Sequence, residues 1–261
     1  MNFVKMNGIG NDYIFINTSK QTIESPSGLA KKLCNRHLSI GADGLVLFKK
    51  SAKDCFIMRI FNPDGSEAEM CGNAVRCLGR LLKDMGAVSG NNLSVQTLSG
   101  IKHLTVCGNL VSVDMGTLKI VATDTEITYI DAGNPHAVVF RENLAGVENE
   151  LKSISQNYLG GINAEAVKIL TRAHIEMRVW ERGAGETLAC GTGACAVAFA
   201  SYKKGLTSSE VIVTLKGGNL SIKINENDSV IMEGLTAYNY FGSLSINDYG
   251  KIKRKLQKVK S

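Results

Sequence analysis

The sequence predicts an α+β protein of two structurally similar domains, each a curved mixed or antiparallel sheet wrapped around a central helix. The first observation is a repeat: Cys71 and Cys190 lie 119 positions apart, and the small-residue stretches that they open end at Gly86 and Gly205, also 119 apart. The second is a series of short β-branched runs, and the third is a pair of nearly all-apolar helical segments. A duplicated unit of this kind predicts two domains related by a pseudo-twofold axis.

The repeat extends on both sides of the cysteines. Met58-Arg59-Ile60-Phe61 matches Met177-Arg178-Val179-Trp180 at the same offset of 119, and Gly10-Asn11 corresponds to Gly133-Asn134 at an offset of 123. We therefore expect one domain over residues 1–117, a second over 118–246, and a basic tail over 247–261.

Short strands joined by glycine and asparagine turns account for most of each half. In the first half the β-branched and alternating runs cover residues 13–17, 44–48, 56–61, 93–98, 101–107 and 110–115, and similar runs follow in the second half. Such spacing favours antiparallel or mixed sheets.

Four longer segments are predicted to be helices, at residues 29–37, 73–85, 147–158 and 192–204. The segments 73–85 and 192–204 are apolar around most of their circumference, so each is expected to be enclosed by its domain. Gly86 and Gly205 follow them where left-handed caps are expected.

The chain has 261 residues and a net charge of +6, of which the tail contributes six lysine or arginine residues against Asp248 alone, 6 − 1 = +5. A frayed, solvated end explains this run more simply than a nucleic-acid or membrane contact. The longest uncharged run, 187–202, has 16 residues, short of the ~20 that span a bilayer. We expect neither a nucleic-acid nor a membrane partner.

Seven cysteines at irregular spacing favour a reducing compartment, and hence a cytoplasmic location. Secretory-signal features are not visible at residues 1–17. The cysteine spacings and the four histidines do not resemble a zinc site, so no metal is expected. A buried cysteine is usually a small hydrophobic side chain, and this interpretation is applied to Cys34, Cys55, Cys77, Cys107 and Cys195.

Cys71 and Cys190 are different because they form a pair at two helix starts. Unpaired backbone N–H groups and the helix dipole favour a thiolate there, and the same N–H groups can hold a substrate carboxylate. Two such thiols could hold one tetrahedral carbon between them, one removing a proton and the other delivering one to the opposite face. This arrangement inverts a stereocentre without a cofactor.

The sequence resembles the diaminopimelate epimerase family through motifs spread over most of its length. They are Gly8-Ile9-Gly10-Asn11-Asp12-Tyr13, Asn35-Arg36-His37, Gly41-Ala42-Asp43-Gly44, Asn62-Pro63-Asp64-Gly65-Ser66, Cys71-Gly72-Asn73, Gly133-Asn134-Pro135-His136, and the run from Glu181 to Ala194 around Cys190. The last block is highly specific. The resemblance implies cofactor-independent interconversion of L,L- and meso-diaminopimelate, on the way to lysine and peptidoglycan.

The resemblance also implies roles for individual residues. Cys71 and Cys190 would be the acid–base pair, helped by His136 and Glu181. The reacting carboxylate would lie on Gly72, Asn73, Gly191 and Thr192. The distal amino-acid end would be held by Asn11, Asn62, Asn134, Asn163, Glu181 and Arg182. Without the motif, Glu181 and Arg182 could equally be an exposed strand-end pair, and His136 a hydrogen-bonded turn residue.

Three departures from the family pattern concern the distal pocket. The segment 117–132 is shorter than is usual in the family, Asn163 lacks its usual Arg and Phe neighbours, and Gly44 stands where some members have glutamine. The thiol pair is unaffected.

Two other kinds of protein remain alternatives. A proline racemase-like enzyme with another or broader substrate also uses two Cys-Gly helix starts, but typically has histidine where this chain has Asn73. A non-catalytic redox or nucleic-acid-binding protein would use the thiols or the tail, but the chain has no Cys-x-x-Cys and a nearly neutral body. The sequence leaves open whether the chain is a monomer or a homodimer.

Overall fold

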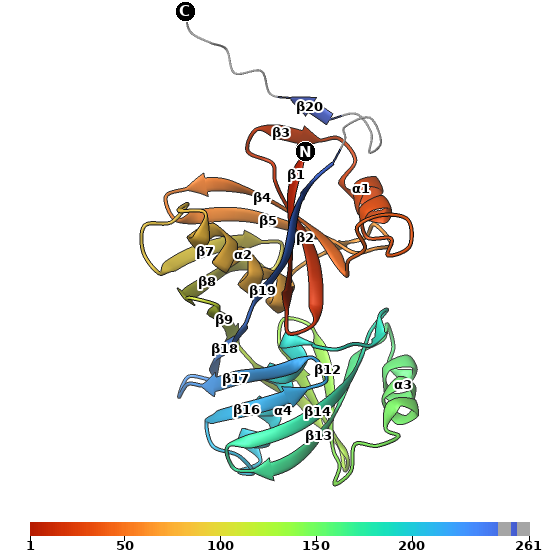
Figure 1. Cartoon of the computed structure of the whole chain (residues 1–261). Helices are drawn as coiled ribbons and strands as arrows, with labels where there is room; N and C mark the ends of the chain where they lie inside the picture. The colour runs from red at the N-terminus through yellow and green to blue at the C-terminus, as the bar shows by residue number, and fades with distance from the viewer. Residues whose placement is uncertain (245–251, 255–261) are drawn as a thin grey trace, which may run out of the picture. The chain divides into compact units, whose positions relative to one another are not determined.

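A computed structural model describes residues 1–244 and 252–254 of the chain. These residues form two compact units, which are described separately below (Figure 1). Unit 1 comprises Met1–Cys107 together with Thr236–Ser261, and unit 2 comprises Gly108–Leu235.

Unit 1 contains a mixed sheet. In order of pairing its strands are β19 (Ala237–Ser243), β1 (Asn2–Gly8), β2 (Asn11–Asn17), β4 (Gly44–Ala52), β5 (Cys55–Phe61), β7 (Asn92–Thr97) and β8 (Gly100–Cys107). The pairs β2–β4 and β5–β7 are parallel and the others antiparallel. The short strand β6 (Glu67–Ala68) pairs with β5. A second short strand, β3 (Gln21–Ile23), pairs with β20 (Ile252–Arg254).

Unit 2 repeats this plan. Its strands, in order of pairing, are β10 (Lys119–Thr123), β11 (Ile127–Asp131), β12 (Pro135–Phe140), β13 (Asn163–Thr171), β14 (His174–Glu181), β16 (Glu210–Leu215), β17 (Gly218–Ile224), β18 (Ser229–Leu235) and β9 (Leu110–Thr117). The parallel pairs β12–β13 and β14–β16 take the places of β2–β4 and β5–β7. Short strand β15 (Gly185–Glu186) pairs with β14 as β6 pairs with β5.

Each sheet packs on one buried helix, as the apolar segments predicted. Helix α2 (Gly72–Asp84) contacts β1, β2, β7 and β8 in unit 1, and α4 (Gly191–Lys203) contacts seven strands from β11 to β18 in unit 2. All residues of 72–79 in α2 are buried, and so are those of 193–201 in α4. The predicted α+β class, with a mixed sheet around a central helix in each half, is confirmed.

Both central helices end in the same hydrogen-bonded cap. Gly86 and Gly205 have φ of 67° and 72°, a left-handed conformation that glycine adopts at little cost. The amide of Ala87 bonds to the Leu82 carbonyl, and that of Leu206 to the Ser201 carbonyl, which completes a Schellman motif in each unit. The caps predicted at these glycines are confirmed.

Two smaller helices cover the other faces of the sheets. Helix α1 (Pro26–Leu33) buries Leu29 and Leu33 against Ile14 and Ile16 of β2. Helix α3 (Glu148–Asn157) packs on β13 and β14 through a cluster that includes Val139 (Figure 1). Because successive strand residues point to opposite faces, Tyr13 in β2 lies on the α2 face, and His136 in β12 and Glu165 in β13 lie on the α4 face.

The compact units divide the chain differently from the sequence repeat. The repeat places 1–117 in the first domain and 118–246 in the second, whereas the units change at Cys107/Gly108 and Leu235/Thr236. The reason is strand pairing: β9 pairs with β18, and β19 pairs with β1. Strands β9 and β18, at equivalent places in the repeat, thus belong to one sheet.

Local signals missed or misplaced some elements. Strand β1 is absent from the sequence prediction. Helix α1 ends at Leu33 rather than at residue 37, because the Asn35 side chain accepts hydrogen bonds from the amides of His37 and Leu38 and forms a turn there. Within the tail expected over 247–261, residues 252–254 form β20, and the rest of that prediction lies outside the described residues.

Candidate active site

Cys71 is the N-cap residue of α2, directly after the hairpin of β5 and β6. Its backbone is extended, with φ −140° and ψ 120°, and its carbonyl accepts the first helical bond from the Val75 amide at 3.0 Å. The next residues, Gly72 and Asn73, therefore carry the first unpaired N–H groups of the helix. This is the helix start that the sequence predicted for the first thiol.

The Cys71 thiol contacts Tyr13, a residue outside the predicted site. The Tyr13 hydroxyl lies 2.9 Å from Cys71 Sγ, and the Tyr13 side chain is 5% exposed. The side chain of Asn11, a predicted substrate contact, hydrogen bonds to the same hydroxyl. Burial, and then the nearby Cys71, raise the pKa of Tyr13 well above its usual range, so the hydroxyl keeps its proton at neutral pH.

Two further predicted residues of unit 1 have structural contacts. The Asn73 side chain is buried and accepts a bond of 2.9 Å from the guanidinium of Arg76, which is itself fully buried. The backbone N–H of Asn73, in the first turn of α2, is a candidate donor to an anion. Asn62 lies just after β5, where its side-chain amide donates to the Ser66 hydroxyl at 2.9 Å.

Cys190 occupies the matching place in unit 2, as the N-cap of α4, with φ −122° and ψ 112°. The Gly193 amide donates to Cys190 Sγ at 3.4 Å, and the Thr192 hydroxyl lies 3.6 Å from it. Only 5% of Cys190 is exposed. The Cys190 thiol also hydrogen bonds to the carboxyl of Glu181, which accepts a second bond from the Thr187 hydroxyl.

The surroundings of Cys190 oppose the thiolate that its helix start favours. Burial, followed by the charges of Glu181 and Glu165, raises the pKa of the Cys190 thiol well above its usual range, and the bonds from Thr192 and Gly193 only partly oppose this. Burial likewise raises the pKa of Glu181. Burial and the two carboxylates come from the tertiary structure, which the position of Cys190 at a helix start does not reveal.

His136 is part of a buried hydrogen-bonded row. Its Nδ1 lies 2.7 Å from Glu165 Oε1, its Nε2 lies 3.1 Å from Asn134 Oδ1, and the side chains of His136 and Glu165 are both 0% exposed. A carboxylate on Nδ1 holds the orientation of the imidazole ring and favours a proton on that nitrogen. His136 is therefore a positioned polar group, as predicted, and Asn134 lies directly beside it.

Asn163 and Arg182 are also brought together. The Asn163 side-chain oxygen accepts the backbone N–H of Arg182 at 2.9 Å, and Asn163 is buried while Arg182 is exposed. A Cβ added to Gly161 would lie 3.0 Å from Arg182 Cγ, so this glycine leaves room for the arginine stem. Of these adjacent residues, Glu181 has a partly buried carboxyl and Arg182 an exposed guanidinium.

Tyr13 and Glu165 were missed by sequence reasoning. The offset of 123 that relates Asn11 to Asn134 also relates Tyr13 to His136, which was the available signal for Tyr13. For Glu165 the signal was a single carboxylate inside the apolar run of β13, where an unpaired charge would be costly.

Most of the remaining cysteines are structural. Burial is the main cause that raises the pKa of Cys34 and of Cys77 to about 12, so both stay protonated, and Cys195 is also buried. The expectation of a core position is wrong for Cys107, which is exposed at the end of β8, and Cys55 is only partly buried.

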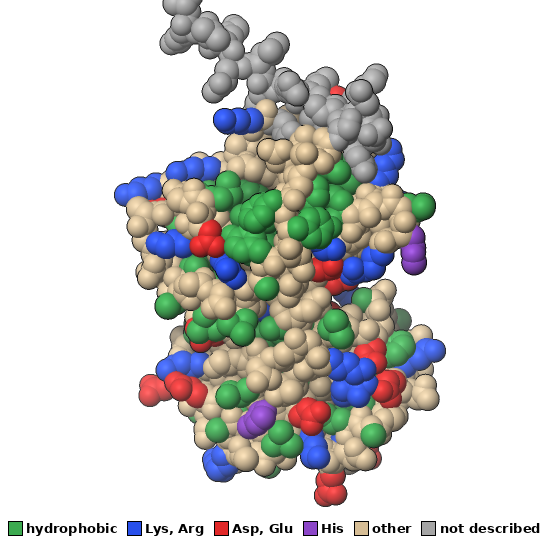
Figure 2. Space-filling view, in the orientation of Figure 1, with side chains coloured by type: hydrophobic (Ala, Val, Ile, Leu, Met, Phe, Trp, Pro, Cys, Tyr) green, Lys and Arg blue, Asp and Glu red, His purple; other side chains and the backbone are tan. Residues whose placement is uncertain are grey.

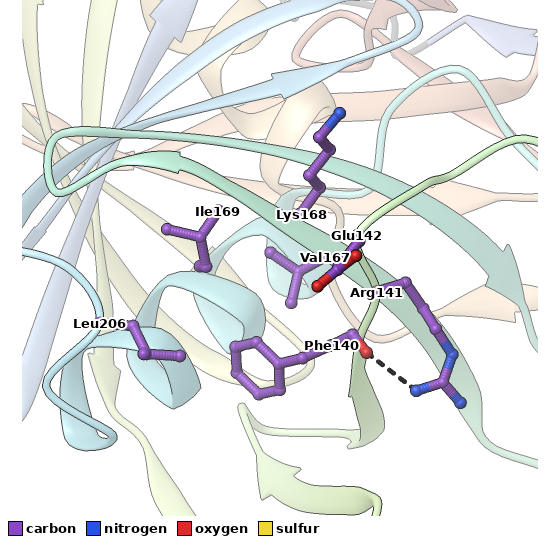
Figure 3. A pocket seen from close by; sticks show the side chains of 7 residues that line it. All are labelled: Phe140, Arg141, Glu142, Val167, Lys168, Ile169 and Leu206. Carbon is purple, nitrogen blue, oxygen red and sulfur yellow. Dashed lines mark hydrogen bonds between the residues drawn. The ribbon is translucent and has the colours of Figure 1, made fainter.

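A separate hollow in unit 2, with a volume of about 430 Å³, contains none of the predicted site residues (Figure 3). It is lined by Phe140, Arg141, Glu142, Val167, Lys168, Ile169 and Leu206. Among the residues that the structure describes, no group of three or more His, Cys, Asp or Glu side chains is placed to hold a metal ion. The helices found in residues 1–244 and 252–254 are all too short or too polar to cross a membrane.

Known proteins resemble this chain in sequence and in fold. The family model described as diaminopimelate epimerase matches residues 3–121 and 128–238. The diaminopimelate epimerase of Acetivibrio thermocellus is 42% identical over 279 residues, which cover 95% of this chain and 100% of that protein. That of Methanococcus maripaludis strain C5 is 41% identical over 94% of this chain and 100% of its own.

Two solved structures share the fold at low sequence identity. A PhzF-family phenazine biosynthesis protein of Bacillus anthracis has a TM-score of 0.76 at 16% identity, covering 94% of this chain and 99% of that one. A probable proline racemase from Agrobacterium radiobacter has a TM-score of 0.71 at 11% identity, covering 94% and 93%. The family model and the full-length relatives show that this chain belongs to the diaminopimelate epimerase family.

Proposed function

We propose that this chain epimerises L,L-2,6-diaminopimelate to the meso isomer by proton transfer between two cysteines, Cys71 and Cys190. Diaminopimelate epimerase activity, an isomerase reaction of lysine biosynthesis, is the activity of the family to which the chain belongs. The observation that carries the mechanism is the repeated placement of a cysteine at the N-cap of a buried helix, once in each unit.

In the proposed reaction the two thiols act on opposite faces of one α-carbon. The thiolate of one cysteine takes the α-proton, so that a C–H bond breaks and an S–H bond forms. The thiol of the other cysteine gives its proton to the opposite face of the carbanion. Stereochemistry is inverted, the thiol and thiolate exchange places, and neither an oxidant nor a cofactor enters the balance.

The reacting carboxylate is proposed to lie on the helix starts at Gly72, Asn73, Gly191 and Thr192. In this proposal their N–H groups face the negative charge that grows as the α-proton leaves, and preorganised donors of this kind lower the barrier by several kcal/mol. Glu181, bonded to the Cys190 thiol, and His136, held by Glu165, would poise the proton transfers.

The distal amino-acid end needs a cation for its carboxylate and oxygen atoms for its ammonium group. Arg182 supplies an exposed guanidinium, and Glu181 a partly buried carboxyl. The remaining contacts are proposed to come from Asn11, Asn62, Asn134 and Asn163.

The proposed reaction is tested by isotope exchange. The purified protein is incubated in deuterated water with L,L-diaminopimelate and no added cofactor, and meso product carrying deuterium at one α-carbon is expected. Cys71→Ala and Cys190→Ala should each abolish product formation, while Cys107→Ala, at an exposed thiol, should keep wild-type turnover. A folded Cys71→Ala or Cys190→Ala variant that still turned over at the wild-type rate would refute the two-base scheme. Proline in the same assay tests the racemase-like alternative.

We also propose that the chain forms a homodimer in the cytoplasm. Strand β19 has one strand partner, β1, among the described residues, and it exposes Phe241 by 68% and Tyr240 by 44%. Figure 2 shows hydrophobic side chains gathered over β19 on the visible face of unit 1. An apolar patch on an edge strand is a common subunit contact. A reducing cytoplasm keeps both catalytic thiols available.

A further inference from the structure

Tyr13 in unit 1 occupies the place that His136 has in unit 2. Each follows a Gly-Asn turn by two residues and lies on the first strand of a parallel pair: Tyr13 stands opposite Gly44 in β2–β4, and His136 opposite Asn163 in β12–β13. Both side chains point to the face covered by the cysteine-bearing helix of their own unit. The repeat therefore places a protic side chain on this face of each sheet.

The Tyr13 ring fits because residue 44 is a glycine. A Cβ added to Gly44 would lie 3.2 Å and 3.3 Å from two ring carbons of Tyr13, and 3.2 Å from the Phe61 carbonyl oxygen. The absent side chain leaves the space that the ring fills. In this position the hydroxyl reaches Cys71 Sγ at 2.9 Å and is bonded to the Asn11 side chain.

We propose that Tyr13 is a positioning residue that holds Cys71 Sγ at the start of α2 and donates a hydrogen bond to its thiolate. This role rests on the proposed function, in which Cys71 alternates between thiol and thiolate. When Cys71 is ionised, the tyrosine O–H can only donate to sulfur. The Asn11 amide group, by bonding to the same oxygen, polarises the O–H bond further.

The surroundings of the two thiols differ in a way that supports this role. Cys190 lies beside the carboxyl groups of Glu181 and Glu165, which oppose its ionisation. Cys71 lies beside a neutral hydroxyl, which favours ionisation. The two thiols therefore differ in the groups beside them, a hydroxyl at Cys71 and carboxyl groups at Cys190.

The titratable and charged groups around Cys71 and Tyr13 come from two places. Cys77 and Arg76 lie on α2, and Asp43, just before β4, acts on the Tyr13 hydroxyl. Cys77 is neutral at working pH because burial raises its pKa to about 12. None of these groups is changed when Tyr13 is replaced by phenylalanine.

The experiment measures ionisation of Cys71 directly. Wild-type protein and Tyr13→Phe are alkylated with iodoacetamide across pH 6 to 11, and the rate at Cys71 is followed by mass spectrometry of its peptide. Since a hydrogen bond to a charged group is worth more than one to a neutral group, the alkylation midpoint of Cys71 should rise by about one to two pH units in Tyr13→Phe. The acid limb of the kcat/KM profile should move in the same direction.

Two further variants separate this role from a general effect on folding. Tyr238→Phe removes a hydroxyl that bonds to Asp84 at the same distance of 2.9 Å in the same unit, and should leave the Cys71 midpoint unchanged. Gly44→Ala pushes on the Tyr13 ring and should raise the midpoint as Tyr13→Phe does. A folded Tyr13→Phe with the wild-type midpoint would overturn the proposal. Because alkylation needs no substrate, that result is distinct from an absence of epimerase activity in the wild type, which would refute the proposed function.

Discussion

Glu165 is a fully buried carboxyl group that contacts His136 and lies close to Cys190. It comes from β13, on the face that packs against α4, and its neighbours in the strand, Ala164 and Ala166, point to the α3 face. A buried carboxylate is costly unless it is hydrogen bonded. The bond from the imidazole to Oε1 offsets part of that cost and fixes the ring beside the site, while Oε2 is buried without a hydrogen-bond partner among the described residues.

Glu165→Gln keeps the volume and a hydrogen-bonding oxygen but removes the charge. The charge of Glu165 raises the pKa of Cys190 and of Glu181, so the alkylation midpoint of Cys190 should move to lower pH. At the same time kcat/KM should fall by about tenfold or more, because His136 loses its anionic partner.

The matched control for this change is Glu210→Gln, which removes a carboxylate from an exposed ion pair with Lys223. It should change neither the Cys190 midpoint nor kcat/KM. An unchanged Cys190 midpoint in Glu165→Gln would show that Glu165 does not act on this thiol.

The buried thiol of Cys77 couples stability to alkaline pH. Its pKa is raised, mainly by burial, from an ordinary value of 9.0 to about 12. The native state therefore retains a proton that the unfolded chain loses, so the stabilisation is complete below pH 9 and is lost as the pH rises towards 12. In that window each such thiol lowers the free energy of unfolding by about 1.4 kcal/mol per pH unit.

Urea unfolding at pH 8, 9 and 10 measures this slope. In Cys77→Val the free energy of unfolding should fall less steeply with pH, because the contribution of one buried thiol is lost. Cys107→Ser, at an exposed position, should show the wild-type slope. Equal slopes for Cys77→Val and the wild type would mean that Cys77 does not hold its proton through this range.

At the scale of elements, each cysteine-bearing helix is preceded by a hairpin with the same ion pair. Arg59 bonds to Glu67 at 2.7 Å across β5 and β6, and Arg178 bonds to Glu186 at 2.8 Å across β14 and β15. These residues are related by the offset of 119. An exposed pair such as Arg59–Glu67 contributes little to stability, about 0–1 kcal/mol, and the Arg178–Glu186 pair is more buried. We attribute to both pairs the orientation of the hairpin that leads into the helix.

The start of α4 depends on Gly193 having no side chain. A Cβ at this position would lie 2.8 Å from Glu165 Oε1 and 3.2 Å from Cys190 Sγ. In an open helix Gly→Ala stabilises by about 1 kcal/mol. Gly193→Ala should instead destabilise by about 1–3 kcal/mol, because buried groups must shift, and kcat should fall by at least about tenfold since the displaced groups include the thiol.

Chemical denaturation and steady-state kinetics check this prediction together. Gly90→Ala is the control, because its added Cβ would meet its nearest atom at 4.0 Å, and it should behave like the wild type. A Gly193→Ala protein that was more stable and fully active would contradict the packing described for the start of α4.

At the scale of the whole molecule, the repeat and the compact units do not coincide. Strand β19 pairs with β1 at one end of the unit 1 sheet, and β10 pairs with β11 at one end of the unit 2 sheet. Both expose apolar side chains, including Val121 on β10 and Phe241 on β19. Strand β19 therefore joins the C-terminal part of the chain to unit 1 and forms its edge.

Phe241→Asp tests the proposed homodimer at that edge. A charge in the middle of an apolar contact is costly to bury, so sedimentation velocity should show a dimer for the wild type and a monomer for the variant. Leu159→Asp, at a side chain 98% exposed in unit 2, should remain dimeric. A wild-type protein that sediments as a monomer at micromolar concentration would exclude this assembly.

Local chemistry explains why much of the fold and the site could be predicted. A small-residue run after a cysteine predicts the start of each central helix, and Gly86 or Gly205 predicts its end. The predicted bounds lie within one residue of the observed ones. Strand β1 was missed because its burial depends on neighbours on both sides, β2 and β19, the second of which comes from the far end of the chain.

The sequence alone determined the duplicated unit, the two cysteines at helix starts and the family, because these depend on spacing and on short motifs. The tertiary structure decided which groups touch the thiols: Tyr13 beside Cys71, and Glu181 with Glu165 beside Cys190. Those contacts depend on the register of parallel strands and on which face of the sheet each side chain points to. At Cys190 burial and the nearby carboxylates oppose the thiolate that the helix start favours, and these surroundings depend on the tertiary structure.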